Sequence, residues 1–311
     1  MLSCFRGDLM EIIPVVPRGY CKGVVRAIEI AKKCAVDYPD QKITVLGMIV
    51  HNQHVVDALK KLNIHTVEDK KKTRMELLDE INEGVVIFTA HGISEQAKQK
   101  ALKKGLICVD ASCTDVIETQ RLVKEKIDEG YHVLYIGKKN HPEAEAVLAI
   151  SDHVHLITSI DDLNLNLAEK LFVTNQTTMS ILEIEKIIEQ IEKKWPDAQI
   201  MREICNATSI RQKAVLDLKE KEIDLLIVVG DPHSNNTTKL KALGSESGIA
   251  HVIMIESVFD LNEVQIKNHN RIAITSGAST PTLLTNQVIE TLKHFASTQE
   301  FIYPEKNTQL I

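Results

Sequence analysis

The sequence predicts an α/β fold made of three similar units, with parallel sheets arranged around a pseudo-threefold axis. The first observation is that Cys21, Cys113 and Cys205 stand at a constant interval of 92 residues, from 21 to 113 and again from 113 to 205. The second is that a helix-like run follows each of these cysteines. The third is that short β-branched runs alternate with helical periodicity, which is typical of parallel sheets with right-handed crossovers. If the units close around the axis, three thiolates meet at its centre.

The cysteine interval sets the boundaries that we expect along the 311 residues. They are an N-terminal segment that carries the first cysteine (1–22), three α/β units (23–113, 114–205 and 206–290) and a C-terminal tail (291–311). Such a repeat is convincing only if other residues recur in phase with it.

A strand that ends in glycine recurs in every unit, and a polar residue and a helical pattern follow it. The glycines are Gly47, Gly137 and Gly230. The polar residues, at intervals of 90 and 93, are His51, His141 and Ser234. These intervals match the cysteine period closely enough to support the same unit.

A second strand in each unit ends in small polar residues. The strands are Val85–Phe88, Leu171–Val173 and Ile272–Ile274. The polar residues after them include His91, Thr177 and Ser279. Helical patterns follow, for example over Ile181–Ile191.

The evenly spaced cysteines also follow strands. The preceding runs are Ile12–Val16, Leu106–Val109 and Ile200–Ile204. Because ligands bind past the carboxyl ends of parallel strands, one pocket is expected to collect the cysteines and the polar residues.

Composition excludes several classes of function. A formal charge of −6 gives no reason to expect nucleic acid or an anionic membrane as a partner. The apolar runs are far shorter than the roughly 20 residues that cross a bilayer, and the N-terminus lacks the apolar core of a secretory signal. We therefore expect a cytoplasmic protein with reduced thiols. The charged run Glu68–Arg74 reads as a solvated segment.

Three cysteines without a fourth disfavour a closed structural zinc site, and no Cys-x-x-Cys pair is present. Three thiolates can hold a four-iron, four-sulfur (4Fe-4S) cluster and leave one iron with an open position. A helix N-terminus stabilises such thiolates. Alternatively, the three cysteines could be buried residues with only a structural role. Their equal spacing and their shared position before helices disfavour this interpretation.

The other polar residues describe an anion pocket. Imidazole, hydroxyl and amide groups, together with helix N-termini, can bind a diphosphate without a basic patch. The candidates are His51, His91, His141, Thr177, Ser234, Asn236 and Ser279. Glu143 is the one obvious acid, and burial with phosphate charge nearby would let it deliver a proton.

These residues resemble the 4-hydroxy-3-methylbut-2-enyl diphosphate reductase family over roughly residues 12–290. The matching stretches are Pro17–Val24, Ile49–Asn52, Thr89–Ser94, Asp110–Cys113, His141–Glu143, Asn175–Thr178, Ile204–Thr208 and Thr275–Pro281. Eight short motifs in the same order make the resemblance specific.

The resemblance implies a role for each matching residue. Cluster ligands fall on Cys21, Cys113 and Cys205, a proton-delivering acid on Glu143, and a threonine near the reacting hydroxyl on Thr177. Diphosphate contacts fall on His51, His91, His141, Ser234, Asn235, Asn236 and Ser279. Two stretches depart from the family pattern: Thr114-Asp115 replaces a usual proline after Cys113, and Gly230–Asn236 is altered around Asn235.

The implied reaction removes the hydroxyl of an allylic diphosphate reductively, which gives isopentenyl and dimethylallyl diphosphate in the last step of the methylerythritol phosphate pathway. The substrate hydroxyl would bind the open iron of the cluster. Since no Gly-x-Gly-x-x-Gly fingerprint is present, electrons would come from an external one-electron donor such as ferredoxin or flavodoxin. The alternatives are an enzyme like quinolinate synthase, which lacks the histidine set, and a non-catalytic iron–sulfur sensor, which would need an output module.

Overall fold

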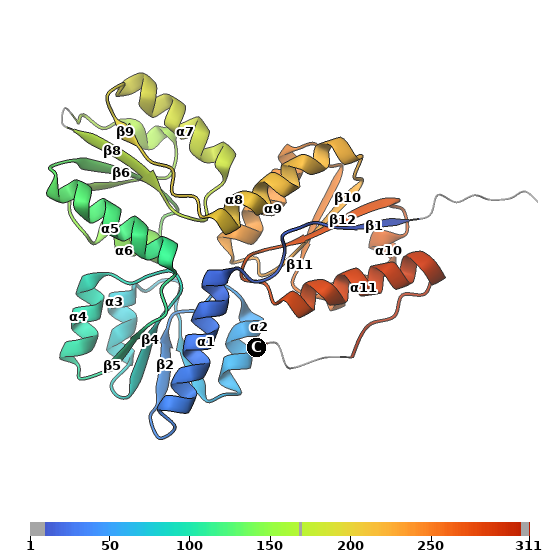
Figure 1. The fold of residues 1–311 in the computed structure, drawn as a ribbon, viewed down its shortest axis with the longest axis horizontal. Coiled ribbons are helices and arrows are strands. Elements are labelled where there is room, and N and C mark those ends of the chain that lie inside the picture. Colours follow the sequence, from blue (N-terminus) through green and yellow to red (C-terminus); the bar gives the residue numbers. More distant parts are fainter. Residues whose placement is uncertain (1–9, 168–169, 306–310) are drawn as a thin grey trace, which may run out of the picture. The chain divides into compact units, whose positions relative to one another are not determined.

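The computed structural model describes residues 10–167, 170–305 and 311. They form two compact units: the terminal unit, from residues 10–21 and 209–305, and the 22–208 unit, which includes Ile311. Three four-stranded parallel sheets with interleaved helices lie in these units (Figure 1). The predicted α/β fold with three similar units is confirmed, whereas the domain boundaries and the axis stay predictions. Cys4 lies outside the described residues.

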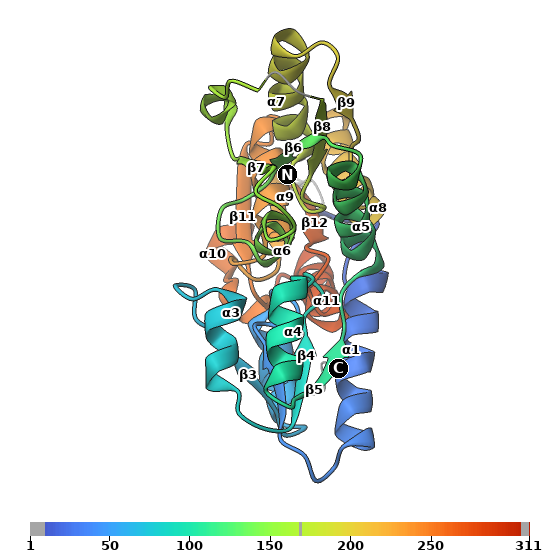
Figure 2. The ribbon, with the colours of Figure 1, turned by 90° about the vertical axis from the view of Figure 1, so that its left-hand side faces the viewer.

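The first sheet, in the 22–208 unit, has the strand order β3-β2-β4-β5. Its elements are α1 (Lys22–Asp37), β2 (Ile43–Leu46), α2 (Gln53–Lys60), β3 (Ile64–Val67), α3 (Arg74–Leu77), η1 (Leu78–Glu80), β4 (Val85–Phe88), α4 (Glu95–Lys103) and β5 (Ile107–Asp110). Val86 and Phe88 pack with α3 and α4 on one face. Figures 1 and 2 show α1 and α2 on the other face. The central strands β2 and β4 are fully buried, which explains why their sequences are apolar apart from Thr44.

The second sheet, in the same unit, repeats this order as β7-β6-β8-β9. Its elements are α5 (Thr114–Asp128), β6 (His132–Ile136), α6 (Pro142–Leu148), β7 (Val154–Ile157), η2 (Ile160–Leu163), β8 (Leu171–Asn175), α7 (Ile181–Lys194) and β9 (Gln199–Ile200). The expected strand over Ile200–Ile204 is wrong beyond Ile200, because only the N–H of Met201 continues the pairing, to Val173.

The third sheet, in the terminal unit, has the order β1-β12-β10-β11. Its elements are β1 (Glu11–Pro14), α8 (Asn206–Leu216), η3 (Asp217–Lys221), β10 (Leu225–Val229), α9 (Asn235–Glu246), β11 (His251–Ile255), η4 (Val258–Asp260), α10 (Glu263–Ile266), β12 (Arg271–Ser276) and α11 (Thr282–Thr298). The N-terminal strand completes the sheet in parallel, with Glu11 opposite Arg271.

The chain after α11 packs back onto the terminal unit. The Tyr303 hydroxyl donates to the carbonyl of Leu261 at 2.7 Å, and the Tyr303 ring contacts those of Phe259 and Phe301. Among the described residues, no helix has the length and apolar character that crossing a membrane requires.

Two leucines near the end of α4 test the packing of the first sheet. Leu106 is 4% exposed and belongs to the core beneath α4, whereas Leu102 is 48% exposed. We expect Leu106→Ala to lower the free energy of unfolding by about 2–5 kcal/mol. The matched Leu102→Ala should change it by about 0.5 kcal/mol or less. Denaturant titration of both variants measures the difference, and equal midpoints would contradict this packing.

Candidate functional site

Three histidine rings lie side by side in the 22–208 unit. His51 follows β2, His91 follows β4, and His141 precedes α6. The rings of His51 and His91 are stacked, with centroids 4.0 Å apart. The His141 ring stands edge-on to them, with centroid distances of 5.4 Å to His51 and 5.6 Å to His91. The structure therefore brings together the three histidines that the sequence places beyond strands.

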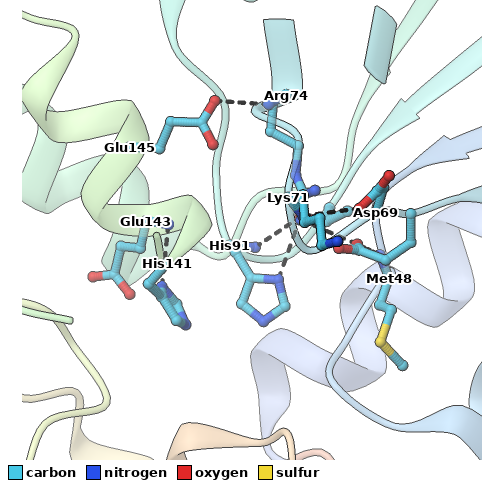
Figure 3. Close-up of polar contacts among 10 residues, drawn as sticks. Met48, Asp69, Lys71, Arg74, His91, His141, Glu143 and Glu145 are labelled. Carbon is cyan, nitrogen blue, oxygen red and sulfur yellow. Dashed lines mark hydrogen bonds and ion pairs between the residues drawn. The ribbon is translucent and has the colours of Figure 1, made fainter. Parts of the chain in front are cut away.

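The helix that His141 begins also orients its ring (Figure 3). His141 is the N-cap of α6, and its Nδ1 accepts the backbone N–H of Glu143 at 3.2 Å. Pro142 occupies the first turn, where its fixed φ suits a helix start. Because Nδ1 is the acceptor, the neutral ring carries its proton on Nε2. His141 can thus donate a hydrogen bond to an anion without being charged.

Burial disfavours the charged form of two of the three histidines. It lowers the pKa of the His91 ring well below its ordinary value, and the positive charges of His51, His141 and Arg74 lower this pKa further. The pKa of His141 is also well below its ordinary value, first through burial and then through His51, Lys138 and Arg74. Negative charge would act in the opposite direction, since it favours the protonated ring. An anion among the rings would therefore draw protons onto them.

Glu143 is buried, with 1% of its surface exposed, and its carboxylate accepts three hydrogen bonds. The backbone N–H of Thr177 donates to Oε1 at 2.8 Å, and the Thr177 hydroxyl donates to Oε2 at 3.0 Å. The hydroxyl of Tyr135 donates to Oε1 at 3.3 Å. Donors on both oxygens fix the orientation of the carboxyl group.

Burial raises the pKa of Glu143 to about 7. The hydrogen bonds from Thr177 and Tyr135 lower this pKa, and the negative charge of Asp115 raises it, but desolvation is the largest cause. A carboxyl group with this pKa is substantially protonated at neutral pH, which suits a general acid.

Sequence reasoning missed Tyr135. It is a fully buried residue of β6, and it reads in the sequence as one more apolar strand position. The available signal was chemical: a buried tyrosine needs a partner for its hydroxyl, and Glu143 follows eight residues later.

The terminal unit holds a second polar group. Ser234 is the N-cap of α9, and the Ser279 hydroxyl donates to its oxygen at 3.3 Å. Asn236 Oδ1 accepts the backbone N–H of Ala278 at 3.0 Å. Asn235 is buried in the same first turn of α9. The structure thus gathers Ser234, Asn236 and Ser279, with Asn235 beside them in the chain.

The backbone N–H of each evenly spaced cysteine donates to a loop that follows a strand. The bonds join Cys113 to the carbonyl of Ala90, Cys205 to that of Thr177 and Cys21 to that of Ala278, at 3.0, 3.1 and 3.0 Å. The three accepting loops are the small polar segments recognised in the sequence. The cysteines and these loops are therefore held at the same ends of their sheets.

The cysteines have the chemistry that an iron–sulfur cluster requires. All three are partly exposed, and each stands directly before a helix, α1, α5 or α8. A helix N-terminus favours the thiolate, which is the form that binds iron. Helix α5 begins at Thr114 with Cys113 as its N-cap, so the missing proline does not prevent the helix start.

The cysteines are divided between the two compact units, with Cys21 in the terminal unit and Cys113 and Cys205 in the 22–208 unit. Over residues 10–167, 170–305 and 311, no group of three or more His, Cys, Asp or Glu side chains is arranged to hold a metal ion. The fit to a cluster therefore rests on ligand type and on position at helix starts.

One charged residue departs from its expected environment. The run Glu68–Arg74 was expected to be solvated, and most of it is exposed or partly exposed, but Arg74 is only 6% exposed. Its guanidinium forms an ion pair with Glu68 and lies against Gly47, where no side chain competes for the space. The burial of Arg74 could not be predicted from the composition of this run, because no local sequence pattern distinguishes a buried Lys or Arg from an exposed one.

Comparison with known proteins gives consistent matches over almost the whole chain. A family model described as LytB protein matches residues 12–293. The 4-hydroxy-3-methylbut-2-enyl diphosphate reductase of Brevibacillus brevis is 45% identical over 303 residues, which cover 96% of each chain. The protein of the same name from Bacillus cereus strain AH820 is 46% identical over 291 residues, which cover 92% of this chain and 91% of the relative.

The fold has a solved counterpart. The E-1-hydroxy-2-methyl-but-2-enyl-4-diphosphate reductase of Plasmodium falciparum superposes with a TM-score of 0.85 at 34% identity, covering 95% of this chain and 91% of the other. The extent of the family match and the identity of the relatives lead to one conclusion. The chain belongs to the LytB protein family.

Proposed function

We propose that this protein is a 4-hydroxy-3-methylbut-2-enyl diphosphate reductase, which removes the substrate hydroxyl to give isopentenyl and dimethylallyl diphosphate. The observation that carries the proposal is the buried Glu143, held by Thr177 and with its pKa raised to about 7, in the same unit as three clustered histidines. Removal of a hydroxyl from a diphosphate substrate requires an acid to protonate the hydroxyl and a group that binds the diphosphate. The relatives that carry this name support it.

The two alternatives receive no support. Family membership over residues 12–293 disfavours an enzyme like quinolinate synthase, and the relatives matched over nearly their whole length are named as the reductase. The relatives' names likewise give a sensor no support.

The diphosphate would be bound by imidazole, hydroxyl and amide groups. His51, His91 and His141 supply imidazole N–H groups from the 22–208 unit. The hydroxyl and amide contacts assigned to the terminal unit are Ser234, Asn235, Asn236 and Ser279. Neutral groups in a buried site avoid the desolvation cost of fixed charges, which explains how a chain of net charge −6 can bind an anion.

An iron–sulfur cluster is the cofactor known for this family. Cys21, Cys113 and Cys205 would hold a 4Fe-4S cluster at three of its irons, with the fourth position open to substrate. Such a cluster supplies one-electron transfer and Lewis-acid activation of the hydroxyl. The electrons would come from an external donor such as ferredoxin or flavodoxin. The reduced thiols agree with the cytoplasmic location expected from the sequence.

Glu143 would deliver the proton that lets the hydroxyl leave as water. Its carboxyl group is protonated in a large fraction of molecules at neutral pH, and Thr177 holds its orientation through two hydrogen bonds. Positioning matters here because the proton must reach one oxygen of a substrate that is anchored at its other end.

Anaerobic turnover of 4-hydroxy-3-methylbut-2-enyl diphosphate with a reduced one-electron donor tests the proposal directly. We expect both diphosphate products, and we expect Glu143→Gln to lower kcat by about 100-fold or more, since amide cannot replace an acid. Glu192→Gln, at an exposed position of α7, serves as the matched control. Full activity of the Glu143 variant would refute its role as the proton donor.

The hydroxyl of Tyr135 gives a test in the pH dependence. Its hydrogen bond lowers the pKa of Glu143, so Tyr135→Phe should raise that pKa above about 7. Because the protonated acid is the active form, activity falls as pH rises through this pKa, and the falling limb should move to higher pH in the variant. A pH profile of kcat measures the shift; an unchanged or lowered limb would argue against the coupling.

Iron content tests the ligand assignment. A serine at position 21, 113 or 205 replaces a soft thiolate with a poor iron ligand. Each variant, Cys113→Ser first, should therefore lose bound iron and the brown colour of the anaerobic protein. Cys108→Ser, a partly buried cysteine in β5, is the control and should retain both. Equal iron content in Cys113→Ser and Cys108→Ser would remove Cys113 from the ligand set.

A further inference from the structure

Arg74 is a buried cation whose surroundings are unusual for arginine. It occupies the first position of α3, and only 6% of its surface is exposed. A Cβ atom at Gly47 would lie 2.4 Å from its Cζ, so the guanidinium fills the space beside the backbone of residue 47. Gly47 directly follows β2 and precedes His51 by four residues. The charge of Arg74 is thus fixed next to the loop that carries one histidine of the cluster.

The contacts of Arg74 also reach the helix that carries His141. Its backbone N–H donates to Glu145 Oε1 at 2.8 Å, and Glu145 lies on α6 two residues beyond Glu143 (Figure 3). Its Nη2 lies 3.3 Å from Oε2 of Glu68, whose carboxylate also accepts the N–H of Met48 at 2.9 Å. Its Nε has no hydrogen-bond partner within the part of the chain that the structure describes. The guanidinium therefore keeps a donor unused although it is buried.

The charge of Arg74 also acts on the histidines. Burial is the largest cause of the low pKa of His91 and His141, and the charge of Arg74 lowers both pKa values further, beside His51 and Lys138 among other positive groups. Glu68, the ion-pair partner of Arg74, offsets part of this charge. Burial raises the pKa of Glu145, whereas the charge of Arg74 lowers it.

We propose that Arg74 is a positioning residue of the anion site: its buried charge, held beside Gly47 and next to helix α6, attracts the diphosphate toward the histidines. The negative charge of the bound anion would in turn favour protonation of the rings. The inference rests on the proposed function, since it assigns a further residue to the same anion site.

Calorimetric binding of inorganic pyrophosphate to the anaerobically purified full-length protein tests this without turnover. Arg74→Met keeps the backbone bond to Glu145 but removes the charge, and it should weaken binding by about tenfold. Arg74→Lys should restore part of the affinity. Arg121→Met is the matched control: it removes an exposed, ion-paired arginine of α5 and should leave binding unchanged.

The pH dependence separates an electrostatic role from a structural one. Arg74 attracts pyrophosphate but repels protonated histidines. At a pH where the histidines of the complex are protonated, Arg74→Met therefore removes both effects, and they partly cancel. Well above the ordinary histidine pKa of about 6.5, no such cancellation exists. The affinity ratio of wild type to Arg74→Met should therefore be larger at alkaline pH than near that pKa. A ratio that is the same at every pH would overturn the proposal.

Glu68→Gln supplies a test of opposite sign. The amide oxygen can still accept the N–H of Met48, but Arg74 loses its ion-pair partner and the field at the histidines grows. Pyrophosphate should bind more tightly than to wild type. Weaker or equal binding would count against the inference even if Arg74→Met folded poorly, which circular dichroism and thermal unfolding would reveal.

The outcomes distinguish this inference from the proposed function. If wild type binds no pyrophosphate, the anion site itself is wrong and both fall. If wild type binds and the Arg74 and Glu68 variants bind equally well, only the role of Arg74 is refuted.

Discussion

The hydrogen bond from each evenly spaced cysteine to a loop beyond a strand is the constraint on which the rest of the site depends. An N–H group at a helix start lacks a partner inside its helix, and a loop carbonyl needs one too, so a single bond satisfies both. Thr177 shows how much follows from it: its carbonyl holds Cys205, while its N–H and hydroxyl hold Glu143. A proposed metal ligand and a proposed acid are thus fixed by one residue.

Desolvation acts on the acid and on the histidines in opposite pKa directions but with one result. It raises the pKa of Glu143 and lowers those of His91 and His141, because the charged form is the costly one in each case. Burial thus favours the neutral form of Glu143, His91 and His141 in the empty site. A bound anion would shift the histidines back toward their charged form.

Much of the fold could be predicted because the buried central strands are continuous apolar runs, as β4 and β10 show. The edge strands β3, β7 and β11 were not predicted, because their partly exposed residues show no clear hydrophobic periodicity. The histidines were found because residues beyond parallel strands converge. Tyr135 and Arg74 were not, because a hydroxyl partner and an inward-turned cation depend on contacts between distant segments, which no local pattern encodes.

The place of β1 in the third sheet has a consequence for synthesis on the ribosome. Arg271, the partner of Glu11 in the sheet, is synthesised 260 residues after it. At ordinary translation rates the strand waits roughly 10 to 50 s for its neighbour. Its unpaired edge is open to wrong partners throughout that interval. The segment that delivers Cys21 is therefore the one most in need of protection in the nascent chain, whereas the 22–208 unit can complete both of its sheets beforehand.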